Sequence, residues 1–312
     1  MKIYDCFMYF DEDLILETRL NILEKYVDYF IIVESKFNHK GEERKLNFNI
    51  EKFIKFKDKI KYLVVDELPN NLEEIFESDN KIIKEHKFIN NAVKRENSQR
   101  NFINHALLNS DEDDFILISD LDEIPCLKNI DLKKINEKIV IFEQIMTYYK
   151  FNLALPDYKW YGTKGCLKKN LISPQWLRNV KSKKYPLYRL DILFNNKRYN
   201  NIRFIKNGGW HFTNIKTAEE IELKFKSYLH HREFDVSGMT LDNIRKIIKD
   251  RYAIYEFLDS LPQSEKDEIF EYVDSRCRAF NKVEHYIFKA FWERYDECSK
   301  EERKILYQGL DE

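Results

Sequence analysis

Three carboxylate side chains follow a short apolar run in this sequence, and their spacing suits a divalent cation. Residues 115–118 are apolar, Ser119 follows, and Asp120, Asp122 and Glu123 come next. An Asp-x-Asp pair at the end of a strand gives one cation hard oxygen ligands and leaves positions for water and phosphate. Two such carboxylates repel each other unless a cation lies between them. The alternative interpretation is a set of acids that cap the next helix.

Cationic side chains gather in two other places. Residues 178–206 hold nine Lys and Arg and a single acid, Asp191, with aromatic residues between them. A half-exposed pair of strands with long basic side chains explains this pattern. A groove for single-stranded nucleic acid is a second interpretation. In a third, one or two of these Lys and Arg residues bind a diphosphate. The second cationic segment is 95–100. Arg95 and Gln99 share a helix face there and precede Arg100, so they can act together on a phosphate or a base edge.

A compact segment, Gly208-Gly209-Trp210-His211, is a further candidate for a functional site. Adjacent glycines permit close approach of the backbone to a ligand. His211 is a candidate third ligand for the cation or a general base, although a lone histidine is more often structural.

The composition excludes several classes of function. The 312 residues include only 7 Gly, and neither GxGxxG nor GxxxxGK[ST] occurs. P-loop NTPases, protein kinases and dehydrogenases with a Gly-rich fingerprint are therefore poor fits. Basic and acidic residues number 53 and 54, so no overall field attracts nucleic acid. No nucleophile elbow or HExxH motif is present, which leaves nucleophilic hydrolase chemistry without support.

The pattern of apolar residues predicts an α/β domain. Strand-like runs alternate with helical periods over the first 120 residues, as in a mostly parallel sheet with crossover helices. Acids at the carboxyl end of such a strand lie where open α/β sheets bind ligands. We expect one catalytic domain over 1–238 and a helical extension over 239–312 packed on it. The predicted strands are 3–10, 29–33, 61–65, 114–119, 139–145, 187–194 and 202–205, and the predicted helices include 95–108, 241–258 and 283–292.

The five cysteines are scattered without CxxC spacing, so neither a disulfide framework nor a zinc site is expected. No apolar run is long enough to cross a bilayer, and an acidic cluster at 11–13 argues against a signal peptide. These features predict a cytoplasmic protein without a transmembrane segment.

Several segments together resemble glycosyltransferase family 17, the family of the β-1,4-mannosyl-glycoprotein 4-β-N-acetylglucosaminyltransferases. The most specific segments are Asp-Leu-Asp-Glu-Ile-Pro at 120–125 and Gly-Gly-Trp-His at 208–211, and 95–100 also matches. Further matches lie at 3–7 with Glu17, Arg19 and Leu20, at 27–34, and at 217–224, so that the resemblance covers most of residues 1–235.

The resemblance implies a GT-A-like nucleotide-sugar-binding fold and an inverting transferase that uses a UDP-sugar, UDP-GlcNAc by family inference, and a glycan acceptor. Mn²⁺ or Mg²⁺ would turn the diphosphate into a better leaving group. By this resemblance Asp120, Asp122 and His211 are the predicted metal ligands. Glu34, Arg95, Gln99, Arg100, Asp120 and Trp210 are the predicted contacts to the nucleotide.

Inversion also needs a base that takes the proton of the acceptor hydroxyl. The candidates are Glu233 first and Asp191 second, and Glu123, next to the predicted metal site, is left open between this role and a structural one. Two rival functions stay open. A haloacid-dehalogenase-type phosphohydrolase uses a strand-end Asp-x-Asp but places it on its first strand, and a non-catalytic sugar-binding module would keep the fold without turnover.

Overall fold

The computed structural model describes residues 1–152, 154–185, 195, 198–227 and 239–250. Its centre is a nine-stranded mixed sheet with the order β3-β2-β1-β4-β7-β6-β9-β5, and β8 also pairs with β6. The strands are β1 (Ile3–Met8), β2 (Tyr29–Ser35), β3 (Ile60–Val65), β4 (Phe115–Asp120), β5 (Glu123–Pro125), β6 (Ile139–Tyr148), β7 (Ala154–Leu167), β8 (Ile202–Ile205) and β9 (Gly209–Thr213).

One half of the sheet is parallel, as the sequence predicts. β1 lies between β2 and β4 and runs parallel to both, and β3 continues the parallel set beside β2. The unbroken apolar runs form these strands because both faces of the parallel sheet are covered. Their carboxyl ends lie on one edge, where Met8 pairs with Asp120.

The long strand β7 joins the two halves of the sheet. It runs antiparallel to both β4 and β6, so β6 has the same direction as β4. β8 and β9 pair with β6 in parallel, and β5 runs antiparallel to β9. The carboxyl ends of β4, β6 and β9 therefore face the same edge of the sheet.

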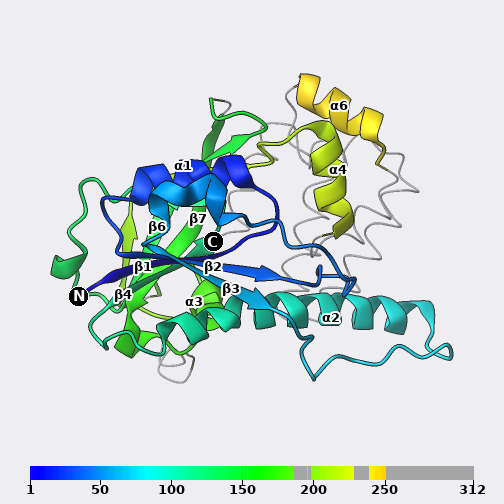
Figure 1. Cartoon of the computed structure of the whole chain (residues 1–312), viewed down its shortest axis with the longest axis horizontal. Coiled ribbons are helices and arrows are strands. Elements are labelled where there is room, and N and C mark those ends of the chain that lie inside the picture. The colour runs from blue at the N-terminus through cyan, green and yellow to red at the C-terminus, as the bar shows by residue number, and fades with distance from the viewer. Residues whose placement is uncertain (153, 186–194, 196–197, 228–238, 251–312) are drawn as a thin grey trace.

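Helices cover both faces of the sheet (Figure 1). The helices are α1 (Asp13–Leu23), α2 (Lys81–Asn101), α3 (Pro174–Asn179), α4 (Ala218–Ser227) and α6 (Leu241–Asp250). Short 3₁₀ helices are η1 (Ile50–Phe56), η2 (Phe102–Leu107), η3 (Leu132–Lys134) and η4 (Lys168–Asn170).

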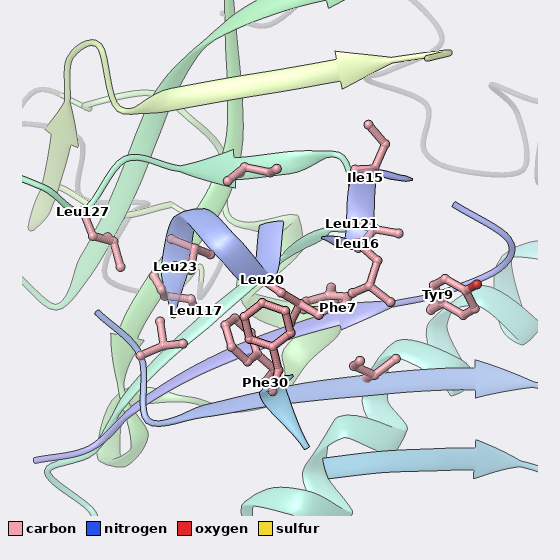
Figure 2. Packing of buried hydrophobic residues seen from close by; sticks show 14 of the residues in the cluster. Phe7, Tyr9, Ile15, Leu16, Leu20, Leu23, Phe30, Leu117, Leu121 and Leu127 are labelled. Atoms are coloured by element: carbon pink, nitrogen blue, oxygen red, sulfur yellow. The ribbon is translucent and has the colours of Figure 1, made fainter. Parts of the chain in front are cut away.

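The core on one face lies beneath α1. Leu16 and Leu20 are fully buried and belong to the same apolar cluster as Phe7 of β1 and Phe30 of β2, as Figure 2 shows. Burial of one such side chain stabilises the fold by about 1.5–3 kcal/mol. The opposite face is covered by η2 and α3, whose Ile103 and Leu177 pack on Ile116 and Ile118 of β4.

The helix before β4 differs from the prediction. The apolar spacing predicts one helix over 95–108, whereas α2 begins at Lys81 and ends at Asn101, and η2 follows. The side chain of Asn80 accepts a hydrogen bond from the backbone N–H of Ile83, which caps the start of α2. Two of the four apolar residues in the first half of α2, Ile83 and Phe88, are exposed, so apolar periodicity does not mark this part of the helix.

A third apolar cluster joins the end of the described chain to the sheet. Ile244 and Ile247 of α6 and Ile221 of α4 are buried together with Met146 of β6. The short segment of the predicted C-terminal extension that the structure describes therefore packs on α4. The predicted strand 187–194, the predicted helix 283–292 and the second half of 241–258 lie outside the described residues.

None of the described helices combines the length and apolar character that a membrane span requires.

Candidate active site

The Asp-x-Asp turn is fixed from beneath by a buried arginine. Arg19 of α1 donates to the backbone carbonyls of Asp120, Leu121 and Glu123, each at 2.9–3.0 Å. Its guanidinium also forms a two-pronged ion pair with Asp5 of β1, with N–O distances of 2.6 and 2.7 Å. Both side chains are fully buried. The pair therefore sets the backbone from which the acidic side chains project.

Asp120 lies between two arginines. Arg100 of α2 contacts Oδ1 at 2.9 Å, and Arg178 of α3 contacts Oδ2 at 2.8 Å. Burial alone would raise the pKa of Asp120, but Arg178 and Arg100 outweigh it and hold the pKa well below its usual range. The Asp120 side chain is 39% exposed, so it remains accessible from solvent despite both ion pairs.

Glu123 organises the wall behind Asp120. Its carboxylate is fully buried, forms a two-pronged pair with Arg178 and accepts a hydrogen bond from the indole N–H of Trp160 at 2.7 Å. It also accepts from the backbone N–H of Asp120 at 2.9 Å. Each of these donors fixes the carboxylate, so Glu123 serves structure here, which was one of the two roles that the sequence left open.

Asp122 lies beside His211. The Nε2 atom of His211 is 3.5 Å from Oδ1 of Asp122, and Trp160 stacks on the imidazole with a ring separation of 4.6 Å. Burial would raise the pKa of Asp122, yet the interaction with His211 outweighs it and lowers the pKa. β9 delivers His211 because it pairs with β5, in which Glu123 lies opposite His211.

These residues fit a cation that protein and substrate hold jointly. A carboxylate oxygen and an imidazole nitrogen are compatible with Mn²⁺, and Mg²⁺ sites commonly use one or two carboxylates with substrate phosphates and water. Within the described parts of the chain, no cluster of three or more acidic, His or Cys side chains forms a complete metal cage. Asp122 and His211 are the two side chains that would hold such a cation, and Asp120 lies next to them on the same turn.

Four of the six residues predicted to contact the nucleotide lie at the end of β2 and along α2. Glu34 is fully buried and accepts hydrogen bonds from the backbone of Asn47 and Phe48 and from Tyr62, and it pairs with Arg44. It therefore orders the 44–48 loop. Arg95, Gln99 and Arg100 lie on α2, and Arg100 alone among them contacts Asp120 directly.

The Gly-Gly segment approaches backbone rather than an open space. A side-chain carbon on Gly209, whose φ is +132°, would lie 2.1 Å from the carbonyl oxygen of Ile124. One on Gly208 would lie 2.7 Å from the carbonyl oxygen of Ile205. Both glycines are therefore required because the backbone packs tightly at the start of β9. The sequence predicted a close approach of this backbone to a ligand, whereas in the structure it approaches neighbouring backbone.

Trp210 and His211 point to opposite faces because side chains alternate along a strand. Trp210 stacks beside Phe212 and packs against the apolar cluster beneath α1. The structure therefore brings His211 to Asp122 and leaves Trp210 on the other face. Glu233 and Asp191, the predicted bases, lie outside the described residues.

Sequence reasoning missed three residues that complete the site. Arg178 is one of the nine Lys and Arg residues in 178–206, and nothing in its spacing distinguishes it from the other eight. Trp160 lies between the matched segments 120–125 and 208–211, so none of the motifs includes it. His39 follows β2 near the charges of Glu96, Arg100 and Asp120. The sequence signal that could have found His39 is its position shortly after a buried strand.

An α/β sheet with paired acids and two arginines at its carboxyl edge is typical of enzymes that bind phosphorylated ligands. The chain matches the sequence model of glycosyltransferase family 17 over residues 1–284. It therefore belongs to glycosyltransferase family 17 and is a glycosyltransferase, as the motifs predict. No curated protein matches the sequence.

Proposed function

We propose that this glycosyltransferase moves N-acetylglucosamine from UDP-GlcNAc to a hydroxyl group of a glycan, with inversion at the anomeric carbon and with help from Mn²⁺ or Mg²⁺. The observation that carries the proposal is the pair of Asp122 and His211 next to Asp120, on the edge where the parallel strands end. This arrangement combines ligands for a cation with arginines for phosphate oxygens.

Asp120, Asp122 and His211 are the predicted metal ligands, and in this proposal Asp122 and His211 would hold the cation, with Asp120 beside them. When bound, the cation would supply positive charge that stabilises the departing diphosphate. Arg100 and Arg178 keep Asp120 ionised and add positive charge at the same place. Trp160 holds the imidazole plane of His211 by stacking, and Glu123 holds Trp160 in turn.

The chemical step is a single displacement. The acceptor oxygen forms a bond to the anomeric carbon while the bond from that carbon to the diphosphate oxygen breaks. The proton of the acceptor hydroxyl passes to a carboxylate, for which Glu233 and then Asp191 are the predicted residues. The diphosphate leaves with the bonding electron pair, and the opposite direction of attack inverts the anomeric centre.

A panel of nucleotide sugars tests the proposal. The protein is incubated with UDP-GlcNAc, other UDP-sugars and GDP-sugars, with Mn²⁺, with Mg²⁺ or with a chelator, and free nucleoside diphosphate is measured. We expect UDP release from UDP-GlcNAc that requires the cation. Phosphate release from monoesters would instead support a phosphohydrolase, and UDP-sugar binding without turnover would support a binding module. Family membership favours the transferase over both.

The proposed base is tested by two isosteric substitutions. We expect Glu233→Gln to lower turnover by at least about a hundredfold, the contribution typical of a general base, and to leave donor binding unchanged. Asp191→Asn is expected to leave turnover near that of the natural protein. The reverse result would assign the role to Asp191, and two active variants would exclude both residues.

A further inference from the structure

A buried lysine lies beneath the short helix α3. Lys164 of β7 is 5% exposed, and its register partners, Ile118 of β4 and Ile141 of β6, belong to the apolar cluster beneath α3. Side chains directly opposite each other in a sheet share a face, so the lysine projects into this apolar layer. Burial of an amine costs free energy that burial of an apolar side chain would not. The contacts of its side-chain nitrogen therefore need an explanation.

These contacts cap the end of α3. Nζ of Lys164 donates to the backbone carbonyls of Arg178 at 2.7 Å and of Val180 at 2.6 Å. The last carbonyls of a helix have no partner within the helix, and a lysine beside them satisfies them and interacts favourably with the helix dipole. Because α3 has only six residues, its own hydrogen bonds hold its end weakly. Lys164 thus fixes the backbone that carries the Arg178 side chain.

The same strand also contacts the other end of Arg178. The guanidinium nitrogen Nη1 donates to the backbone carbonyl of Gly162 at 2.8 Å. Gly162 lies two residues before Lys164, where β7 approaches Glu123 so closely that a side-chain carbon would lie 2.7 Å from its Cδ atom. β7 therefore holds Arg178 at two points, at its backbone through Lys164 and at its guanidinium through Gly162.

This guanidinium lies within the candidate active site. Its Nη2 atom is 2.8 Å from Oδ2 of Asp120 and 2.6 Å from Oε1 of Glu123. An arginine side chain has several rotatable bonds, so holding it in one orientation costs conformational entropy. A contact that fixes its backbone reduces the number of orientations from which the other contacts must select. Accuracy matters here, because a displacement of about 1 Å at a substrate-positioning group can cost about a hundredfold in rate.

We propose that Lys164 is a positioning residue, which orients Arg178 toward Asp120 and toward the diphosphate of the donor by fixing the end of α3. Lys164 itself touches neither the donor nor the cation in this proposal. The effect on the diphosphate rests on the proposed function. The effect on the orientation of Arg178 rests only on the contacts that Lys164 and Gly162 make.

The orientation of Arg178 is tested by NMR of the arginine side chains in the full chain without a ligand. A guanidinium held by several hydrogen bonds rotates slowly and gives separate Nη signals. The signals of Arg178 are those that Arg178→Met removes. We expect separate signals in the natural protein. In Lys164→Met the side chain still fills the apolar layer but cannot donate to the carbonyls, so we expect the Arg178 signals to merge.

Binding of UDP tests the consequence for the donor. Calorimetry in the presence of Mn²⁺ gives the Kd for the natural protein, for Lys164→Met, for Arg178→Met and for the double variant. We expect Lys164→Met alone to weaken binding at least about tenfold, because it displaces a positioned group. In the Arg178→Met background the same change is expected to alter the Kd less than about twofold, because the two residues act through one contact. Lys164→Gln retains an N–H donor and is expected to recover part of the affinity.

Lys59→Met is the matched control. Nζ of Lys59 donates to the backbone carbonyls of Glu24 at 2.5 Å and of Val27 at 2.9 Å, just after the end of α1. The contact is of the same kind, but it lies at the amino ends of β2 and β3, away from the site. This variant is expected to lower the Tm while it keeps the Arg178 signals and a Kd for UDP within about twofold, because distant sites act independently. Thermal unfolding confirms that each variant is folded, and if Lys164→Met is not, Lys164→Gln carries the comparison.

Arg178 signals that stay separate in Lys164→Met would overturn the inference. A loss of UDP affinity that is equally large in Lys59→Met, or in the Arg178→Met background, would overturn it as well, because the loss would then come from lower stability alone. These outcomes are distinct from failure of the proposed function. If the Arg178 signals respond to Lys164→Met but no nucleotide sugar is bound or consumed, Lys164 still orients Arg178 and the proposed function fails.

Discussion

Replacing Asp122 by asparagine is expected to reduce sugar transfer by at least about a hundredfold, the loss typical for removal of one group that stabilises developing charge. The amide has nearly the same shape as the carboxylate but no charge, so it binds a divalent cation weakly and no longer pairs with His211. Product formation with UDP-GlcNAc measures the transfer, and electron paramagnetic resonance of Mn²⁺ measures cation binding. Both are expected to fall together.

Asp113→Asn is the matched control for this experiment. Asp113 belongs to the same acidic stretch, but its side chain is 75% exposed and its ion pair is with Lys169. The control is expected to keep transfer and Mn²⁺ binding within about twofold, because exposed ion pairs contribute little. If Asp122→Asn behaves like Asp113→Asn, then Asp122 has no part in the reaction and the proposed site is wrong.

Replacing Arg19 by methionine is expected to destabilise the protein by about 3–5 kcal/mol, the usual cost of leaving one partner of a buried ion pair alone. Methionine retains much of the apolar stem but leaves the Asp5 carboxylate without its partner. It also leaves the carbonyls of Asp120, Leu121 and Glu123 without the donor that gathers them. Urea unfolding followed by circular dichroism measures the loss.

The control for Arg19 is Arg245→Met on α6. Arg245 also pairs with two carboxylates, those of Glu219 and Asp242, but its side chain is 54% exposed. The expected loss of stability is below about 1 kcal/mol. A loss for Arg19→Met that is no larger than for Arg245→Met would show that the buried pair does not hold the turn. Asp5→Asn provides a second variant from the other side of the pair.

The parallel half of the sheet was predictable because its physical signal is local. Strands buried on both faces need continuous apolar residues, and the runs at 29–33 and 115–118 have no other simple explanation. The apolar run at 115–118 also predicts that Asp120 lies at the carboxyl end of a strand, and β4, which ends at Asp120, confirms this.

The other half was harder to predict because its strands face different environments along their length. β7 begins outside the core and ends beside β4, so apolar residues neither alternate regularly nor form one run. α3 has only six residues, and its start depends on the Ser173 side chain, which accepts a hydrogen bond from Trp176. Such short capped helices give no measurable periodicity.

The site was predictable in its acids and in His211, and less so in their partners. The spacing of Asp120 and Asp122 predicts that the two acids lie together at a strand end, whereas the position of Arg178 beside Asp120 depends on where α3 lies in space. Glu34 illustrates the opposite case. The family resemblance implied a contact between Glu34 and the nucleotide, whereas in the structure its carboxylate accepts hydrogen bonds from the backbone of the 44–48 loop, which is a long-range arrangement.

The pairing of β5 has a consequence for how the protein is made. β5 follows the Asp-x-Asp turn directly, yet its sheet neighbour is β9, which is synthesised much later. The parallel half leaves the ribosome first and can begin to fold, because domains form from the N-terminal side during synthesis. Closing the long loop between β5 and β9 costs entropy before the contacts between them form. A nascent chain that stops before Gly209 therefore carries both aspartates but not the strand that brings His211 to them, and the site is completed late in translation.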